Sequence, residues 1–300
     1  MKALVTGGAG FIGSHIVDQL ISNGAKVKVI DNLSTGSIKN INSKADFIKC
    51  DITNSKMVKK IMHGCDTIFH LAAFTSVPLS FLYTKECKKV NQSAFNNILM
   101  FASQLNVKKI VFSSTSAVYS DNQRGPCNEK TLVAPSSPYG KSKIYGEKEL
   151  YKWSKEKNDR SGTALRYFNV YGPRQEADSD YASVIPKFIS QIKRKEPVSI
   201  YGDGKQTRDF VFVDDVVSAN LLTCGLSNYS TYVVGTGVET SVIKLVKLLE
   251  MILSCDIDRS YSPLPKGDAI SSCSDISKLK NIGWEISTDI HVGLIITLNK

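Results

Sequence analysis

A chain of 300 residues is longer than most single domains and suits one large α/β unit followed by a smaller lobe. With 42% hydrophobic residues it can bury an ordinary core, but no apolar run approaches the ~20 residues of a membrane span, which argues against a membrane protein. The first residues enter a strand directly and leave no room for a signal peptide, so we expect a cytoplasmic protein.

The net charge of +10 does not indicate a nucleic-acid-binding protein, because the lysines are spread along the whole chain. A solvated basic surface explains the charge better. The seven cysteines are dispersed without a C-x-x-C pair, which is typical of reduced thiols in a cytosolic protein. The four histidines show no ligand spacing, so no metal site is expected.

The first informative stretch is a glycine-rich turn between a predicted strand and a predicted helix. A short apolar run at residues 3–5 predicts a buried strand, and apolar residues at helical spacing predict a helix over residues 16–21. Between them, Gly7 permits a tight turn, Gly10 lets the backbone approach a pyrophosphate, and Gly13 lets helix and strand pack closely. This arrangement predicts a dinucleotide-binding site.

A carboxylate at the end of the second predicted strand selects the cofactor. That strand covers residues 26–30 and leads to Asp31, which lies about 20 residues beyond the glycine turn, where this fold needs an acceptor for ribose hydroxyls. A carboxylate repels the 2′-phosphate of NADP, and no compensating arginine stands among Asn32, Leu33 and Ser34. The sequence therefore predicts NAD.

Strands and helices continue to alternate after this point. Strands are expected around residues 47–48, 67–71 and 109–112, and helices over residues 55–62 and 88–105. Alternation at this spacing requires right-handed crossovers, which predict a doubly wound parallel sheet of the Rossmann type.

Asp51 falls just past one of these strands, at the edge where such a sheet holds its ligand. Two interpretations of this carboxylate stay open. It can accept a hydrogen bond from the adenine amino group, or it can cap the helix that follows. The residue type suits both roles.

A second informative stretch places a tyrosine and a lysine on one helix face. Ser137 and Pro138 predict a helix start, and Tyr139 and Lys143 are then four residues apart with converging side chains. Tyrosine titrates near pH ~10, so a tyrosine base needs its phenolate stabilised. An ammonium one turn away, a helix N-terminus and a cationic nicotinamide would each lower its pKa. Thr115, expected on the loop after the preceding strand, can share the reacting proton.

Taken together, these motifs resemble the extended short-chain dehydrogenase/reductase family, and within it the nucleotide-sugar 4-epimerases. The resemblance extends over essentially the whole chain, and the segments that carry it are residues 6–13, 31–36, 70–73, 113–119, 139–143, 166–174 and 201–210. The resemblance implies an isomerase that epimerises carbon 4 of a UDP-sugar through a transient 4-keto intermediate. It also implies a smaller C-terminal α/β lobe for the substrate.

The resemblance also assigns roles to individual residues. Tyr139 would take the proton from a sugar hydroxyl, Lys143 would bond the nicotinamide ribose, and Thr115 stands where the family has serine or threonine. The remaining cofactor contacts that it implies are Gly7, Gly10, Phe11, Ile12, Gly13, Asp31, Asn32, Leu33, Ser34, Thr35, Gly36, Asp51, Ile52, Leu71, Ala72, Ala73, Thr75, Asn91 and Phe168.

For the substrate, the resemblance points to Asn169 and Arg208 as the groups that hold the nucleotide diphosphate. Arginine suits this role because its fork bonds phosphate oxygens bidentately. Tyr201 is either a base-stacking residue or a core aromatic, and both interpretations stay open. Asp268 belongs to the same set of implied substrate contacts.

The chain departs from the family pattern at two positions. Relatives usually carry an arginine before the pair 267–268, where this chain has Pro265 and Lys266, so the second diphosphate contact is missing or falls to the lysine. Ser272 takes the place of a bulky aromatic found in enzymes restricted to unmodified hexoses. A small side chain there would admit an N-acetyl group, so we expect UDP-N-acetylglucosamine to be accepted as well as UDP-glucose.

We expect two discontinuous domains. Residues 1–169 would bind NAD, rejoined by about residues 209–236, and residues 170–300 would hold the nucleotide-sugar. The resemblance also implies a homodimer, formed through the helices near residues 88–105 and 139–156 in a four-helix interface.

Two classes of alternative remain. A 4,6-dehydratase or decarboxylase would place an acid on the loop after Thr115, where this chain has residues 116–118 without a carboxylate. A reductase would consume free NADPH, which Asp31 disfavours. A non-catalytic NAD-binding regulator would have no need of Tyr139 and Lys143.

Overall fold

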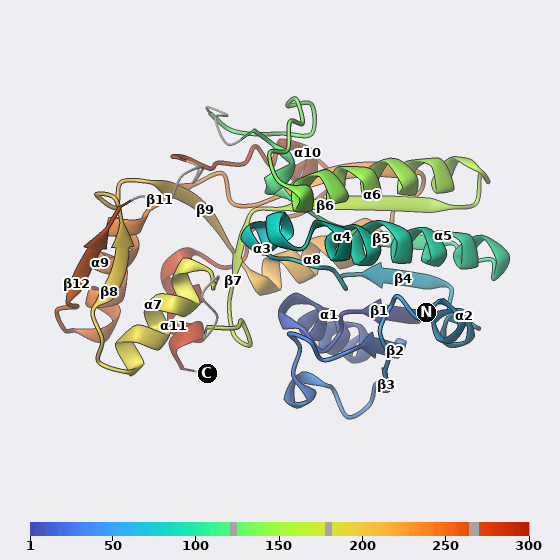
Figure 1. The fold of residues 1–300 in the computed structure, drawn as a ribbon, viewed down its shortest axis with the longest axis horizontal. Coiled ribbons are helices and arrows are strands. Elements are labelled where there is room, and N and C mark those ends of the chain that lie inside the picture. Colours follow the sequence, from blue (N-terminus) through green and yellow to red (C-terminus); the bar gives the residue numbers. More distant parts are fainter. Residues whose placement is uncertain (121–124, 178–181, 264–269, 300) are drawn as a thin grey trace.

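The computed structural model describes residues 1–120, 125–177, 182–263 and 270–299. Within these ranges, the largest sheet has seven parallel strands in the order β10-β6-β5-β4-β1-β2-β3 (Figure 1). The strands are β1 (Lys2–Thr6), β2 (Lys26–Asp31), β3 (Asp46–Lys49), β4 (Thr67–His70), β5 (Lys109–Thr115), β6 (Ser161–Tyr167) and β10 (Tyr229–Val234). The order runs outward from β1 and β4 in opposite directions, so the predicted doubly wound sheet is confirmed.

Helices cover both faces of this sheet (Figure 1). On one face, α1 (Phe11–Ser22) packs against α8 (Val213–Cys224). The other face carries α2 (Ser55–Met62), α3 (Val77–Leu82), α4 (Thr84–Lys88), the π-helix η2 (Lys89–Ser93), α5 (Ala94–Gln104) and α6 (Pro138–Lys155). Successive strand residues face opposite layers: Val5 packs with the cluster around α1, and Leu4 packs with the cluster around α5.

The second half of the chain builds a smaller group of elements beside the large sheet (Figure 1). Strand β9 pairs with β7 in parallel and with β11 in antiparallel orientation, and β8 pairs in parallel with β12. These elements are β7 (Asn169–Tyr171), β8 (Val198–Tyr201), β9 (Thr207–Phe212), β11 (Glu239–Ser241), β12 (Arg259–Ser262), α7 (Val184–Lys193), α9 (Val242–Leu253), α10 (Ser277–Lys280) and α11 (Ile290–Leu298).

The chain crosses between the two groups more than once. Of the stretch 209–236, α8 and β10 belong to the layers of the large sheet, whereas residues 210–212 lie in β9 of the small sheet. The division into two domains at residue 169 stays a prediction. In the part of the chain that the structure describes, no helix has both the length and the apolar character needed to cross a membrane.

The ends of several elements differ from the predicted ones. Strand β5 runs three residues further than expected, to Thr115, because its polar end still pairs with β6. The helix expected over residues 88–105 begins at Thr84 and contains the π-helical turn η2. Thr115 is therefore fixed at the end of a strand and is not part of a loop. The short 3-10 helices η1 (Ile38–Asn40) and η3 (Ser116–Val118) lie in connections.

Candidate active site

The glycine turn between β1 and α1 has the close packing that its sequence requires. Gly7 has a φ of +74°, a conformation that favours glycine, and a Cβ added there would lie 2.7 Å from Ala72 N. A Cβ on Gly13 would lie 2.1 Å from Gly7 O. Helix α1 starts at Phe11, and its N-cap residue Gly10 has no side chain to cap it, so the helix N-terminus can receive a phosphate. Phe11 and Ile12, half-buried, follow in its first turn.

Asp31 ends β2 beside this turn and is almost completely buried. Its Oδ2 accepts a hydrogen bond from Ala9 N at 3.0 Å, and its Oδ1 accepts one from Leu33 N at 2.8 Å. The carboxylate thereby joins the glycine turn to the loop 32–36. Each carboxylate oxygen has a further lone pair, so the group can still accept bonds from two ribose hydroxyls. Gly36, at the end of this loop, packs closely against the glycine turn, because a Cβ there would lie 2.9 Å from Ala9 C.

Asp51 is not the helix cap. Its Oδ1 accepts hydrogen bonds from the Thr53 backbone and hydroxyl, and its Oδ2 accepts one from Asn32 Nδ2 at 2.8 Å. Asn54 caps α2 instead, by accepting a bond from Met57 N. Burial alone would raise the pKa of Asp51, but the bonds from Thr53 and Asn32 outweigh it and hold the pKa below its usual range. Asp51 therefore borders the loop after Asp31.

The loop after β4 completes the wall of the cofactor region. Leu71 N and Ala72 N both donate to Thr6 O at 3.0 Å, which places this loop against the end of β1. The side chain of Asn91 accepts a bond from Phe74 N at 2.7 Å and donates to Phe74 O and to Ser142 Oγ. The side-chain amide of Asn91 thus forms hydrogen bonds within the protein, and its predicted contact with NAD stays a prediction.

The remaining predicted cofactor residues lie on the same segments. Ile52 and Phe168 are buried, Thr75 is exposed, and Ala73 is half-buried. Ser34 and Thr35 lie in the loop after Asp31, and Ser34 N donates to Asn32 Oδ1. The uncapped helix N-terminus, the glycine cradle and the buried carboxylate fit a dinucleotide. Contacts of individual residues with NAD stay predictions.

The N-terminus of α6 carries the predicted proton-transfer group. Ser137 caps the helix by accepting a bond from Gly140 N, and Pro138 is its first residue, as predicted. Lys143 is 3% exposed, and its Nζ donates to Ser113 O at 2.8 Å and lies 5.8 Å from the centre of the Tyr139 ring. The structure therefore brings the predicted tyrosine and lysine together on one helix face.

Thr115 meets Tyr139 from the end of β5. Its hydroxyl lies close enough to the phenol to influence the phenol's pKa. Burial raises the pKa of Tyr139 to about 12, and Thr115 lowers it only in part. Burial also lowers the pKa of Lys143 to about 8. The expected lowering of the tyrosine pKa is thus not achieved by the protein's own groups, because desolvation of the phenolate dominates.

A buried ion pair behind this group escaped the sequence reasoning. Glu147, one turn beyond Lys143, accepts two bonds from Arg166 of β6, at 2.9 and 2.7 Å, and one from Ser114 Oγ. Arg166 also donates to Tyr119 OH at 3.1 Å. The pair fixes α6 to both strands that lie under it. The spacing of four residues from Tyr139 through Lys143 to Glu147 is the sequence feature that could have placed Glu147 on the same face of α6.

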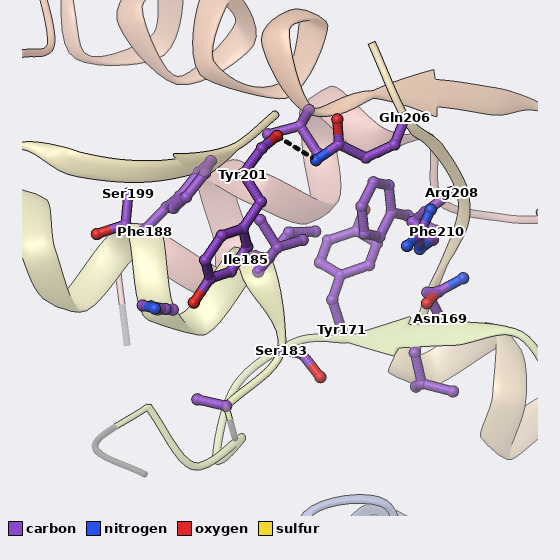
Figure 2. Close-up of a pocket in the computed structure, with 15 residues that line it drawn as sticks. Asn169, Tyr171, Ser183, Ile185, Phe188, Ser199, Tyr201, Gln206, Arg208 and Phe210 are labelled. Carbon is purple, nitrogen blue, oxygen red and sulfur yellow. Dashed lines mark hydrogen bonds between the residues drawn. The ribbon is translucent and has the colours of Figure 1, made fainter. Parts of the chain in front are cut away.

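A cavity of about 290 Å³ lies between β7, β8, β9 and α7 (Figure 2). Asn169, Tyr201 and Arg208, which were predicted from two separate segments, all line it. Tyr201 is 38% exposed and lies over the Lys187 ammonium, 5.4 Å from the ring centre, so it is not a core aromatic. Gln206 was not predicted; its Nε2 donates to Tyr201 O at 2.8 Å and holds that strand end.

Two further predicted substrate residues, Ser272 and Asp268, come late in the sequence. Ser272 is half-buried and precedes Cys273, whose carbonyl accepts a bond from Cys127 N at 2.9 Å. Its role towards the sugar stays a prediction. Asp268, together with Pro265 and Lys266, lies outside the described residues. Among those that are described, no group of three or more His, Cys, Asp or Glu side chains could hold a metal ion.

These features define an NAD-binding α/β protein with a cavity among its smaller group of elements, and comparison with known proteins identifies its family. The model of the NAD dependent epimerase/dehydratase family matches residues 3–235, so the chain belongs to this family. The family resemblance and the cofactor predicted from the sequence are confirmed.

Several relatives that match almost the whole chain are named as UDP-sugar epimerases. The chain is 38% identical to a putative UDP-glucose 4-epimerase of Methanocaldococcus jannaschii, over 97% of this chain and 95% of that protein. It is 41% identical to the structure of UDP-glucose 4-epimerase with UDP-glucose from Thermotoga maritima, with a TM-score of 0.95 and coverage of 100% and 98%. UDP-N-acetylglucosamine 4-epimerase from Methanobrevibacter ruminantium, in complex with UDP-N-acetylmuramic acid, is 39% identical, with a TM-score of 0.93 and coverage of 99% and 97%.

Proposed function

We propose that this protein is an NAD-dependent epimerase that inverts carbon 4 of a UDP-sugar. The observation that carries the proposal is the buried Tyr139 phenol, which lies beside the Thr115 hydroxyl and one helical turn from Lys143. A purely NAD-binding regulator has no use for such a proton-transfer group. The relatives named for this activity, which match almost the whole chain, support the same conclusion.

In this proposal each residue of the group has one task. The Tyr139 phenolate accepts the proton of the sugar 4-hydroxyl while a hydride leaves the same carbon, which gives a 4-keto sugar. Thr115, beside the phenol, would share the proton, and Lys143 would provide positive charge near the phenolate. When bound, NAD would supply the hydride-transfer chemistry, held by the glycine turn and Asp31, and the 4-keto sugar would turn over in the pocket so that its other face receives the hydride. Tyr139 then returns the proton.

The rival reactions are not favoured. Elimination or decarboxylation needs an acid near the neighbouring carbons of the sugar. The segment after Thr115 is η3, whose residues Ser116, Ala117 and Val118 carry no carboxylate. The buried Asp31 disfavours the 2′-phosphate that an NADPH-dependent reductase would use.

We assign the cavity lined by Asn169, Tyr201 and Arg208 to the nucleotide diphosphate. An arginine and an amide suit phosphate oxygens, and an exposed tyrosine offers a face for the base. We further propose that the small side chain of Ser272 admits an N-acetyl group. Turnover of UDP-N-acetylglucosamine at a rate similar to that of UDP-glucose would support this assignment, and activity confined to the plain hexoses would overturn it.

The function is tested by incubating the purified protein with each of four UDP-sugars, namely the glucose, galactose, N-acetylglucosamine and N-acetylgalactosamine forms, without added cofactor. We expect the carbon-4 epimer to form from at least one of them, because NAD is regenerated in every cycle. Nuclear magnetic resonance of the sugar ring distinguishes the epimers. A stable protein that binds NAD and leaves all four sugars unchanged would contradict the proposal.

We also propose a cytoplasmic homodimer. Helices α5 and α6 lie side by side, and their outer faces expose Met100 and Tyr151, at 47% and 49%. Apolar surface on two adjacent helices suits a four-helix interface with a second copy. Sedimentation velocity should give a dimer, and Met100→Asp combined with Tyr151→Asp should give monomers. A monomeric unsubstituted protein at micromolar concentration would contradict this part.

A further inference from the structure

A buried carboxylate in β9 lies directly behind the cavity. Asp209 is completely buried, and its Oδ1 accepts hydrogen bonds from Thr236 N at 2.7 Å and Thr236 Oγ1 at 2.6 Å. Its Oδ2 accepts bonds from Gly237 N at 2.9 Å, from Ser274 N at 3.0 Å and from Ser274 Oγ. These donors are neutral backbone and hydroxyl groups aimed at a charged acceptor, which makes the hydrogen bonds strong.

The donors come from segments that are far apart in the sequence. Thr236 and Gly237 follow β10 of the large sheet, whereas Asp209 itself lies in the small sheet. Ser274 belongs to the segment after Ser272 and forms a β-bridge with Cys127. The carboxylate therefore joins the large sheet, the small sheet and the segment 272–274 at one point.

The packing around this point leaves no free space. A Cβ added to Gly235 would lie 2.4 Å from Ser274 Oγ and 2.9 Å from Asp209 Oδ2. A side chain at position 235 would therefore displace the Ser274 hydroxyl and the Asp209 carboxylate from their hydrogen bonds. The close approach indicates that the arrangement is rigid, because none of the three segments can shift without losing its hydrogen bonds.

Asp209 is connected to the cavity wall through its own backbone. Side chains alternate along a strand, so Arg208 and Phe210 face the cavity while Asp209 faces the opposite side (Figure 2). Asn169 Nδ2 donates to Asp209 O at 3.2 Å, and Figure 2 shows Asn169 beside Arg208 on the wall. Asn169 is therefore hydrogen-bonded to the backbone of Asp209, and Arg208 is the residue before Asp209 in β9.

We propose that Asp209 is a positioning residue for the nucleotide-sugar: its buried carboxylate holds Arg208 and Asn169 where they meet the diphosphate. The proposal rests on the proposed function for the identity of the ligand. Loss of the carboxylate should weaken UDP binding and raise the KM for the UDP-sugar. It should leave kcat and the NAD content nearly unchanged, because Tyr139 and Lys143 lie on α6, outside this hydrogen-bond network.

The test compares Asp209→Asn with Asp215→Asn. The amide at position 209 keeps one acceptor but turns an NH₂ group towards backbone donors, so the network is broken. Asp215 is a matched control because it is also completely buried and accepts bonds from Ser287 N, Ser287 Oγ and Thr288 N, but it does not line the cavity. Both variants should lose stability, which thermal unfolding measures.

Calorimetric titration with UDP, together with KM and kcat for the UDP-sugar, separates the two. We expect Asp209→Asn to raise the Kd of UDP and the KM by about tenfold or more, with kcat within about threefold of the unsubstituted protein. Asp215→Asn should leave the Kd of UDP unchanged. Equal weakening in both variants, or unchanged UDP binding in Asp209→Asn, would overturn the proposal.

A milder pair of variants covers the case in which Asp209→Asn does not fold. Ser274→Ala removes one hydroxyl donor to Asp209, and Ser287→Ala removes one hydroxyl donor to Asp215. We expect only Ser274→Ala to weaken UDP binding, by about threefold or more. UDP binding equal to that of the unsubstituted protein in Ser274→Ala would count against the proposal. Failure of the proposed function is seen separately, as an unsubstituted protein that binds UDP without forming an epimer.

Discussion

The phenol of Tyr139 is held in surroundings that the protein's own groups make unfavourable for a phenolate. Burial raises its pKa to about 12, and Thr115 offsets only part of that rise. Burial also disfavours the charged form of Lys143, because it lowers the pKa of the ammonium to about 8. Both shifts disfavour the charged forms that the proposed mechanism needs, and a cationic nicotinamide, when bound, would favour the phenolate.

The pH dependence of kcat should report Lys143. The ammonium is the active form, so its contribution is present below its pKa of about 8 and is lost as the pH rises through that value. We expect kcat to fall above pH 8. Lys143→Arg keeps its charge at every accessible pH, so the enzyme should be slower but the fall near pH 8 should disappear.

Measuring kcat from pH 6 to 10 for both proteins checks this assignment. The same alkaline fall in Lys143→Arg would show that another group is responsible.

At the scale of elements, the glycine turn shows how a local sequence builds part of the site. Gly13→Ala would bring a Cβ to 2.1 Å from Gly7 O, so α1 would have to move away from β1. We expect at least about tenfold weaker NAD binding and a loss of ~1–3 kcal/mol in stability. Gly225→Ala, at the end of α8, is the control: its Cβ would approach no atom closer than 3.2 Å. Fluorescence titration with NAD and urea unfolding measure the two effects, and unchanged NAD binding in Gly13→Ala would contradict this account of the turn.

The buried pair between α6 and β6 should matter more for stability than any surface pair. Glu147→Gln would leave the buried guanidinium of Arg166 without its counter-charge, at a cost of ~3 kcal/mol or more. Glu149→Gln removes the partner of the exposed Lys152 and should cost far less, because water screens this pair. Equal unfolding free energies for the two variants in urea would show that the buried pair does not fix α6.

At the scale of the whole molecule, the sequence predicted what depends on local spacing. The strand, glycine turn and helix around Gly13 are contiguous, and Ser137 sets the start of α6 so that Tyr139 and Lys143 share a face. Contacts between distant segments could not be predicted in this way. Glu147 meets Arg166, and Asp209 meets Ser274, only because the sheets bring their segments together.

The same limit explains the features that the sequence left open or placed differently. Asp51 and Asn54 both precede α2 and both suit a cap, and only the backbone geometry shows that Asn54 takes that role. Thr115 was expected in a loop because its neighbours are polar, but pairing with β6 extends the strand to include it. The cavity combines β7, β8, β9 and α7, and no single segment reveals it.

The central claim is that a hydride leaves carbon 4 and returns to it while Tyr139 carries the hydroxyl proton. Its most direct test uses a UDP-sugar labelled with deuterium at carbon 4 and converted in ordinary water. We predict that the epimer retains the deuterium at carbon 4, and that Tyr139→Phe binds NAD but forms no product. An epimer carrying hydrogen from the solvent at that carbon, or full activity without the phenol, would contradict the account.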